Sequence, residues 1–353
     1  MFEQLLEKAR AGDLTPELAL RILEDSRRPE NALKLFGVAS ELRDKYIGRE
    51  LWWTAAIEGI MPCKLVPPCS YCSYTNHEIM SEELLLKALR ALEQLGFRHL
   101  HLSGGTNPAG YDNEIIGMVK AMRAVSDIDI EVNLGPSMTR ETVRELKKLG
   151  VASITSSLET FNEEVFKAAK PGDSLEKRKE LLEICEAEGM PTRGMMLVGL
   201  GESYEDRIGQ LFYLRRFKGL LHVWFSRFSP SPSTAYRDHP RCSPWELART
   251  IAVARLIMPR VQLGLAAGNS HDDIPLWFLA GGGNQLLGAG VGRKKASERS
   301  ETGVTQLAED VAVHSRMEIQ ERYIREMGLT ITKTPGHAKQ RERLALPGFF
   351  IPD

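Results

Sequence analysis

The segment Met61-Pro62-Cys63-Lys64-Leu65-Val66-Pro67-Pro68-Cys69-Ser70-Tyr71-Cys72 is the stretch from which the fold and chemistry of this chain can be inferred. Three of the five cysteines lie within it, at the spacing C-x5-C-x2-C. Its prolines exclude a helix, because proline lacks a backbone donor and clashes with the preceding turn. Three thiolates on one short loop suit a [4Fe–4S] cluster in which one iron has no protein ligand. That iron is then free to bind another molecule.

A structural zinc site is the main alternative for three clustered cysteines. Such a site needs a fourth cysteine or histidine at a suitable spacing, and His77 is the one nearby candidate in the sequence. A disulfide framework is disfavoured, because five cysteines in 353 residues do not form one. The spacing therefore favours the iron–sulfur cluster, with Cys63, Cys69 and Cys72 as its ligands.

The composition is that of an ordinary globular protein, with 42% hydrophobic and 26% charged residues, and it allows a large core. A net charge of -1 gives no bulk attraction to nucleic acid or to an acidic membrane. Residues 1–8 carry acidic side chains and lack the apolar segment of a signal peptide, and no long apolar run follows. Together with reduced thiols, these features indicate a cytoplasmic protein without a nucleic-acid or membrane partner.

Apolar residues at helical spacing predict helices over residues 1–47. Thr15 precedes Pro16 and Glu17, which is the pattern of an N-cap followed by proline at the first helical position. We expect this N-terminal extension to form a helical lid on one end of the following domain, where it could close the mouth of that domain.

Over residues 48–328, short strand patterns alternate with amphipathic helical patterns. Eight such alternations predict a (β/α)8 TIM barrel, an α/β fold whose active-site groups lie at the C-terminal ends of the strands. An open doubly wound sheet would carry G-x-G-x-x-G after its first strand, which this chain lacks. The predicted strands are 51–57, 99–103, 129–134, 152–158, 192–198, 222–227, 261–266 and 285–288, and the predicted helices are 81–95, 113–125, 139–149, 174–188, 203–218, 244–258 and 271–280.

The C-terminal part gives weaker signals. Residues 293–305 are polar and charged, which indicates a mobile loop at the barrel mouth. A helix is expected near 305–327, ended by Gly328. Residues 329–353 contain three prolines and are expected to form an irregular strap over the barrel.

The fourth predicted strand has one polar face. With the two-residue period of a strand, Ser153, Thr155, Ser157 and Glu159 share that face. Strands of a parallel barrel are normally apolar on both faces, so a polar face predicts a ligand cavity. A buried glutamate needs a cationic or donor partner, and Arg178 in the next helix could pair with it or bind a ligand carboxylate. The alternative interpretation, for each residue considered separately, is that Glu159 is exposed and that Arg178 is a solvated residue on the surface of its helix.

Two further charged residues lie on neighbouring strand patterns. Glu131 in the third strand and Arg193 in the fifth could both point into the barrel. There they would either bind a substrate or form a structural ion pair. The sequence leaves both alternatives open.

Taken together, these residues resemble the radical S-adenosylmethionine superfamily over about residues 50–290. Cys69-Ser70-Tyr71-Cys72 matches the C-x-aromatic-C ending of that family's cysteine motif, in which the aromatic ring borders the adenine. Gly104-Gly105-Thr106 stands where the family has G-G-E, which holds the methionyl amino group. Thr106 departs from that pattern.

Three segments are similar to the biotin synthase branch of the superfamily, which includes biotin synthase, the [FeFe]-hydrogenase maturase HydE and methylornithine synthase. They are Leu158-Glu159-Thr160, Lys170-Pro171-Gly172-Asp173-Ser174 and Val198-Gly199-Leu200-Gly201-Glu202. By this match Ser157 and Glu159 would contact the ribose or amino group of S-adenosylmethionine, and Arg178 its carboxylate. The cofactor-binding residues that the resemblance implies are Tyr71, Gly104, Gly105, Thr106, Asn133, Ser157, Glu159, Arg178 and Leu200.

Differences between this sequence and the motifs of the branch narrow the choice of the branch member that it most resembles. The usual spacing is C-x3-C-x2-C, whereas C-x5-C-x2-C resembles the HmdB proteins, which are associated with making the iron-guanylylpyridinol cofactor of [Fe]-hydrogenase. Biotin synthase itself is disfavoured, because the positions of its second-cluster ligands are occupied here by Leu102, Glu131, Arg193 and Gly264. A HydE-like maturase or a methylornithine-synthase-like mutase is the alternative within the branch.

The resemblance implies an enzyme with a [4Fe–4S] cluster and S-adenosylmethionine as cofactors. One electron would cleave the cofactor to methionine and a 5′-deoxyadenosyl radical, which removes hydrogen from a small-molecule substrate. The expected partners are that substrate, with a pyridinol precursor as the candidate, and an electron donor such as ferredoxin or flavodoxin. The protein's part would be to position the reacting atoms and exclude water.

Overall fold

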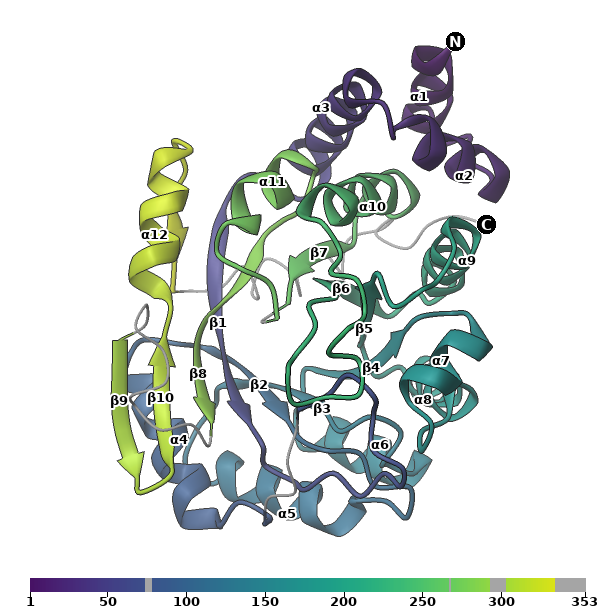
Figure 1. Ribbon diagram of the computed structural model, residues 1–353. Helices are drawn as coiled ribbons and strands as arrows, with labels where there is room; N and C mark the ends of the chain where they lie inside the picture. The colour runs from purple at the N-terminus through teal and green to yellow at the C-terminus, as the bar shows by residue number, and fades with distance from the viewer. Residues whose placement is uncertain (74–77, 267, 293–302, 334–353) are drawn as a thin grey trace.

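The computed structural model describes residues 1–73, 78–266, 268–292 and 303–333 of the chain. Its centre is a closed parallel barrel, because β1 pairs with β2 on one side and with β8 on the other. The predicted (β/α)8 barrel is confirmed, and helices surround it in Figure 1. The barrel strands are β1 (Leu51–Glu58), β2 (His99–Ser103), β3 (Asp129–Asn133), β4 (Ser153–Glu159), β5 (Thr192–Val198), β6 (Leu220–Arg227), β7 (Gln262–Leu265) and β8 (Gln285–Gly292).

Apart from α7, the helices that connect these strands begin within two residues of the predicted positions. The Oγ atoms of Ser81 and Thr139 each accept a backbone hydrogen bond from the first turn of their helix, at 3.3 Å in both cases. The seven-residue helix α7 was not predicted, because it is too short to show a helical period. The connecting helices are α4 (Glu82–Gln94), α5 (Asp112–Arg123), α6 (Arg140–Lys148), α7 (Glu163–Ala169), α8 (Leu175–Glu188), α9 (Tyr204–Arg215), α10 (Pro244–Ile257) and α11 (Asp273–Leu279).

Three N-terminal helices pack against α9, α10 and α11, beside the end of the barrel where the strands begin (Figure 1). Arg43 of the third helix donates hydrogen bonds to the carbonyl groups of Phe278 and Gly282, which precede β8. Because the active-site mouth of such a barrel lies at the opposite end, the expectation that these helices could close the mouth is wrong. The helices are α1 (Phe2–Arg10), α2 (Pro16–Asp25) and α3 (Pro29–Tyr46).

The C-terminal part contains a β-hairpin where the sequence predicted the beginning of a helix. Strands β9 (Gly303–Ala308) and β10 (Val311–Ser315) pair antiparallel, and β10 extends the sheet next to β8. The prediction is wrong there because the β-branched Val311 and Val313 alternate along a strand. Helix α12 (Met317–Glu326) follows, and the short β11 (Ile331–Thr332) pairs with β1. Residues 293–302 of the predicted loop and 334–353 of the predicted strap lie outside the described residues.

The deepest layer of the barrel is filled by polar side chains rather than the branched apolar ones that are usual in this fold. Arg193 lies at its centre and is 1% exposed. It donates hydrogen bonds of 2.9 Å to Oγ of Ser153 and to Oε1 of Gln285, and it lies 2.8 Å from Nδ1 of His222. Its Nε is 3.3 Å from Oε2 of the fully buried Glu131. This polar layer fills the barrel below the active-site end.

Glu131 and Arg193 therefore form the ion pair that was one of the two sequence alternatives. Burial by itself would raise the pKa of Glu131, but the nearby Arg193, His101 and His99 outweigh burial and hold that pKa well below its usual value. The carboxylate is thus charged at neutral pH. A buried pair of this kind contributes little net stability, but each partner alone would be a costly uncompensated charge.

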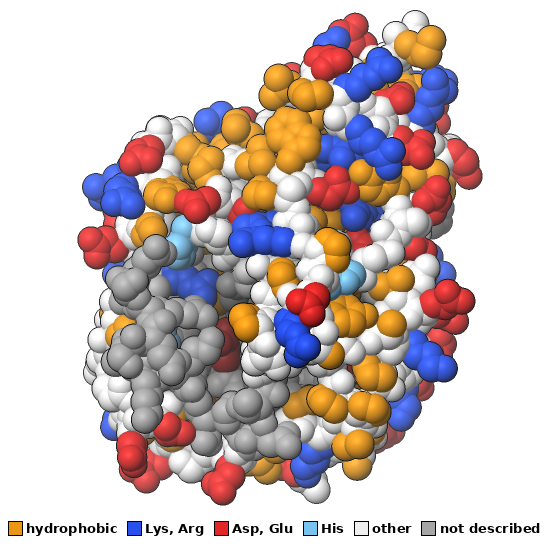
Figure 2. All heavy atoms as spheres, in the orientation of Figure 1, with side chains coloured by type: hydrophobic (Ala, Val, Ile, Leu, Met, Phe, Trp, Pro, Cys, Tyr) orange, Lys and Arg blue, Asp and Glu red, His pale blue; other side chains and the backbone are white. Residues whose placement is uncertain are grey.

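Positive and negative side chains are interspersed over the face shown in Figure 2, in keeping with the net charge of -1. In the described part of the chain, no helix has both the length and the apolar character needed to cross a membrane.

The substitution Glu131→Ala should lower the free energy of unfolding by about 3–5 kcal/mol, because it leaves Arg193 buried without a counter-charge. Urea unfolding followed by circular dichroism measures this loss. The double variant Glu131→Ala/Arg193→Met should recover part of it, since both charges are then removed. A double variant as unstable as the sum of its single variants would contradict this account.

Candidate active site at the carboxyl ends of the strands

The cysteine loop follows β1 and is fastened at its beginning to the end of β2. The amide of Gly105 donates to the carbonyl of Met61, and the amide of Lys64 donates to the carbonyl of Thr106, both at 2.9 Å. A Cβ atom on Gly105 would lie only 2.3 Å from the backbone of Cys63. The glycine at this position is therefore required by the close approach of two backbones.

The far end of the loop is fastened to α7 and to the segment after β6. The amide of Ser70 donates to the carbonyl of Ala169, and its hydroxyl donates to the carbonyl of Ala168, both at 2.8 Å. The carbonyl of Ser70 in turn accepts from the amide of Tyr236 at 2.9 Å. Backbone contacts on both sides thus set the position of the three cysteines.

None of the three cysteines of the loop is in a disulfide; Cys63 and Cys69 are half-buried and Cys72 is exposed. Burial raises the pKa of the Cys69 thiol to about 11, although Lys170 acts in the opposite direction. A thiol of this kind ionises readily only when a metal binds it. Three thiolates with no fourth ligand fit the cluster, which the loop would hold through these three sulfurs.

A single-ion zinc site needs its ligands gathered around one atom. Among the described residues, no group of three or more His, Cys, Asp or Glu side chains is arranged to hold one metal ion. A [4Fe–4S] cluster asks for a wider spacing, because each thiolate binds a different iron. His77, the fourth ligand considered for zinc, lies outside the described residues.

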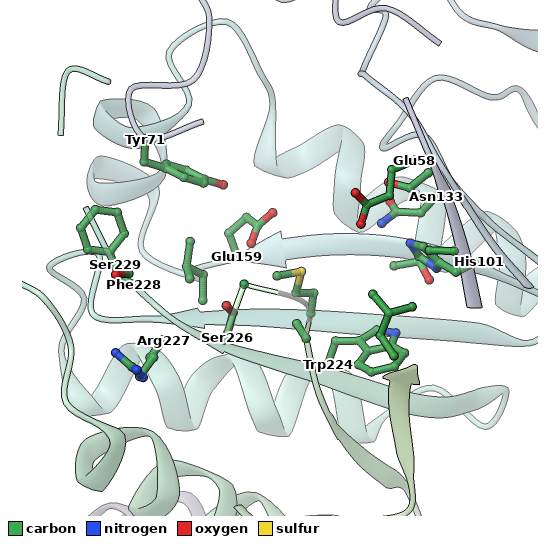
Figure 3. A pocket seen from close by; sticks show the side chains of 18 of the residues that line it. Glu58, Tyr71, His101, Asn133, Glu159, Trp224, Ser226, Arg227, Phe228 and Ser229 are labelled. Atoms are coloured by element: carbon green, nitrogen blue, oxygen red, sulfur yellow. The ribbon is translucent and has the colours of Figure 1, made fainter. Parts of the chain in front are cut away.

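Beside the loop, a cavity of about 360 Å³ opens into the barrel. Figure 3 shows side chains that reach it from several strands, with Tyr71 of the cysteine loop on one side. The ring of Tyr71 packs edge-on against that of Phe228, with 6.5 Å between the ring centres. The polar side chains that line the cavity include Glu58, Tyr71, His101, Ser103, Asn133, Thr155, Glu159, Ser226 and Arg227.

Glu159 is directed into the cavity by an irregularity at the end of β4. Its φ of 62° is unusual for a residue with a side chain, and the pairing of β4 with β5 shifts register between Ser157 and Glu159. The side chain is 10% exposed, and its Oε1 lies 3.7 Å from Nζ of Lys170. Its Oε2 has no hydrogen-bond partner among the described residues. Such an unpaired acceptor beside a cavity is available to a ligand.

Arg178 is buried, and its partner is Asp173 rather than Glu159. Its Nε and one terminal nitrogen donate to the same carboxylate oxygen at 3.0 and 2.6 Å. Burial would raise the pKa of Asp173, but Arg178 and Lys170 together hold it below its usual value. The sequence-based pairing of Arg178 with Glu159 is therefore wrong, because Lys170 and Asp173 lie between them in the chain and take these partners.

Arg178 nevertheless connects other predicted site residues. It donates to the carbonyl of Ser157 at 2.7 Å and to Oγ1 of Thr106 at 3.4 Å. The amide of Gly104 donates to the carbonyl of Asn133 at 3.1 Å. The ends of β2, β3 and β4 thus converge on one hydrogen-bonded group near the cysteine loop.

The predicted residues differ in their access to the cavity. Tyr71, Asn133 and Glu159 line it, whereas Ser157, Arg178 and Leu200 are buried beside it. The amide of Leu200 donates to the Glu202 carboxylate at 2.8 Å.

Several side chains that the structure brings into or beside this site were not predicted from the sequence, among them Lys170, His101 and Trp224. Lys170 lay within a segment noted only for its resemblance. His101 could have been found from the two-residue period of β2, which places it on the interior face with Ser103. Trp224 gave no signal, because an aromatic residue in a strand most often packs in the core.

Comparison with known proteins agrees with this geometry. Residues 63–211, which contain the cysteine loop and strands β2 to β5, match the family model described as "Radical SAM superfamily". The chain therefore belongs to the radical S-adenosylmethionine superfamily. Members of this superfamily use a [4Fe–4S] cluster together with S-adenosylmethionine, and this chain is an enzyme of that class.

Three relatives show its place in the superfamily. The chain is 32% identical over 263 residues to the uncharacterized protein MJ0785 of Methanocaldococcus jannaschii, covering 72% of this chain and 69% of that protein. It is 27% identical over 260 residues to biotin synthase of Chlamydia pneumoniae, covering 70% and 78%. It is 25% identical over 264 residues to the [FeFe] hydrogenase maturase subunit HydE of Thermotoga maritima, covering 72% and 74%.

The fold is also found in a solved structure. HydG, a maturase of the [FeFe]-hydrogenase, superimposes with a TM-score of 0.79 at 18% identity, covering 96% of this chain and 77% of that one. At this identity the likeness concerns the fold alone.

The substitution Gly105→Ala should displace the cysteine loop, because the added methyl group would overlap the backbone of Cys63. We expect a loss of most of the iron bound after anaerobic reconstitution, measured by iron and sulfide analysis. Gly117→Ala in α5 is the matched control, since a Cβ there meets nothing within 4 Å. Equal iron content in the two variants would show that the close approach is not needed.

Proposed function

We propose that this enzyme cleaves S-adenosylmethionine reductively and uses the resulting radical to remove hydrogen from a small molecule in the barrel. The cluster and S-adenosylmethionine would supply the electron transfer and the carbon–sulfur cleavage. The single observation that carries the proposal is a three-cysteine loop, fixed by backbone contacts, beside a polar-lined cavity at the carboxyl ends of the strands. This is where such barrels bind substrates.

The chain's own residues would divide the remaining tasks. Cys63, Cys69 and Cys72 would hold the cluster, and Tyr71 would border the adenine. Glu159, with one carboxylate oxygen unpaired, would accept a hydrogen bond from the ribose or the amino group. The remaining cofactor-binding candidates are Gly104, Gly105, Thr106, Asn133, Ser157, Arg178 and Leu200.

Arg178 is proposed as the cation for the methionyl carboxylate. Asp173 fixes its guanidinium, and guanidinium groups bind carboxylates through paired hydrogen bonds. Arg178 would thereby also orient Thr106, which stands where related enzymes have a glutamate.

The finer proposal is a role in making the iron-guanylylpyridinol cofactor of [Fe]-hydrogenase, with a pyridinol precursor or a related small molecule as substrate. Its support is the C-x5-C-x2-C spacing. A HydE-like maturase or a methylornithine-synthase-like mutase is the second candidate, and the sequence similarity to HydE favours the former of these. Neighbouring genes for [Fe]-hydrogenase cofactor assembly would support the first proposal, whereas genes for [FeFe]-hydrogenase maturation or pyrrolysine synthesis would contradict it.

The partner for electron transfer is proposed to be a ferredoxin or flavodoxin. A reduced cluster of this type fits the reducing cytoplasm.

Anaerobically reconstituted protein should bind about four irons per chain and cleave S-adenosylmethionine when dithionite is added. Cys69→Ala should abolish cleavage, because only two thiolates then remain for the cluster. Cys185→Ala is the matched control, since Cys185 is buried on α8 and should leave cleavage unchanged. Deoxyadenosine and methionine are measured by chromatography. Iron-free protein that holds one tight zinc ion would instead indicate a zinc-stapled binding protein.

Arg178→Met should weaken S-adenosylmethionine binding by about tenfold or more, because it removes a charge-assisted hydrogen-bond donor. Lys177→Met, one residue earlier on the exposed face of α8, should leave the affinity unchanged. Equilibrium dialysis gives the dissociation constant, and iron analysis shows whether each variant retains its cluster. Unchanged affinity in an iron-replete Arg178→Met enzyme would refute the assigned role.

A further inference from the structure

The floor of the cavity holds two nitrogen-bearing rings to which the proposed cofactor chemistry gives no task. His101 comes from β2 and Trp224 from β6, and Figure 3 shows both at the same end of the cavity. Tyr71, the cysteine-loop residue of the cavity, lies on its other side in that view. These two rings are therefore placed to meet a substrate rather than the cluster.

The orientation of the His101 ring is set by the buried ion pair below it. Its Nδ1 lies 2.9 Å from Oε1 of Glu131, whose other oxygen faces Arg193. Thr155 donates a hydrogen bond to Oε1 of the same carboxylate. Nδ1 makes no hydrogen bond of good geometry among the described residues, but its 2.9 Å approach to the charged carboxylate favours a neutral ring with the proton on Nδ1, which leaves Nε2 as a hydrogen-bond acceptor. His101 is 17% exposed at its side chain, and the cavity is where that exposure lies.

Trp224 supplies the complementary donor. Its ring is 8% exposed, and its Nε1 has no hydrogen-bond partner among the described residues. The ring packs against that of His222, with 4.1 Å between ring centres and 34° between the ring planes. Gly264 leaves the space for this packing, because a Cβ there would lie 2.8 Å from Cε3 of Trp224. A buried donor without a partner is costly, so its presence in a cavity wall points to a ligand that accepts from it.

The charged side chains nearest this floor disfavour a carboxylate as the group bound there. The other charged side chains in its lining are Glu58, Glu159 and Arg227. Arg227 is already bound to both oxygens of the buried Asp273, at 3.1 and 3.0 Å. In the view of Figure 3, Arg227 lies on the other side of the cavity from His101, whereas the acidic Glu58 lies at the same end as that ring. The nearby wall includes Met195 and Leu287, which favour an uncharged, flat group.

We propose that His101 and Trp224 form a paired acceptor and donor that selects a substrate carrying an N–H or O–H next to a carbonyl or ring acceptor. A lactam or a hydroxylated heteroaromatic ring has this arrangement, and its flat face fits between the apolar side chains. Glu131 acts as a positioning residue, because it fixes which nitrogen of His101 accepts. This assignment rests on the proposed radical enzyme, whose substrate would occupy this chamber.

The test uses holoenzyme with cluster and S-adenosylmethionine, without reductant, and two probe ligands measured by isothermal titration calorimetry. 2-Pyridone carries an N–H beside a carbonyl, and N-methyl-2-pyridone lacks the donor but keeps the ring. Wild-type enzyme should bind 2-pyridone at least about tenfold more tightly, the cost of an unmade buried hydrogen bond. His101→Phe should remove this preference, and Trp224→Phe should weaken both ligands alike, since both retain the carbonyl.

Further measurements separate recognition from folding. Glu131→Gln should reduce the preference for 2-pyridone, and nitrogen NMR of the imidazole should show that His101 no longer holds its proton at Nδ1. His239→Phe is the histidine control, because its Nε2 already contacts the carbonyl of Gly199. Equal affinity for the two pyridones, no binding of either, or a preference that survives in His101→Phe would overturn the assignment. Failure of the radical enzyme itself would appear separately, as absence of deoxyadenosine when dithionite is added.

Discussion

The close packing of the cysteine loop on the glycines after β2 is the constraint on which the site depends. A Cβ on Gly104 would lie 3.0 Å from the amide nitrogen of Met61, and one on Gly105 would lie 2.3 Å from that of Cys63. Main chain thus rests on main chain, and hydrogen bonds on either side of this contact tie the loop to the barrel. Because β1 and β2 are paired in the barrel, the position of the three thiols follows from the register of two strands.

The barrel could be predicted from sequence because it repeats a local unit. Each strand is a short buried run followed by an amphipathic helix with a recognisable cap, and each unit packs on its neighbour in the chain. The hairpin β9–β10 breaks this regularity. Its strands are short, with charged residues at the turn, and β10 pairs with β8, from which residues 293–302 separate the hairpin in the chain. The periodicity of apolar residues within a short window gives no information about a strand partner that is distant in the chain. A helix was predicted here because charged residues hide the alternation of apolar and polar residues that is typical of a strand.

Many of the residues that form the site could be predicted from the sequence, but the ion pairs that its charged residues form could not. The spacing of three cysteines within ten residues is enough to predict that they bind an iron–sulfur cluster. The spacing of the charged residues does not predict their pairing, because a sequence gives their signs without their partners. The bulge at Glu159 turns its carboxylate toward the cavity and Lys170, while Arg178 is bound by Asp173 five residues earlier on the same segment. A register shift of one residue is enough to exchange such partners, and strand alternation assumes that no shift occurs.

The polar layer at the base of the barrel can be explained by its contact with His101, which lies above it at the cavity floor. An apolar layer would fill the same space without the desolvation cost of burying Glu131 and Arg193, and it would often be at least as stable. Such a layer would leave Nδ1 of His101 facing hydrocarbon, and nothing would then determine which ring nitrogen carries the proton. The charged carboxylate 2.9 Å away favours the tautomer whose proton is on Nδ1. The structure therefore gives up stability in the core for a fixed hydrogen-bond acceptor at the cavity floor, which is the arrangement expected where a protein must recognise a small molecule.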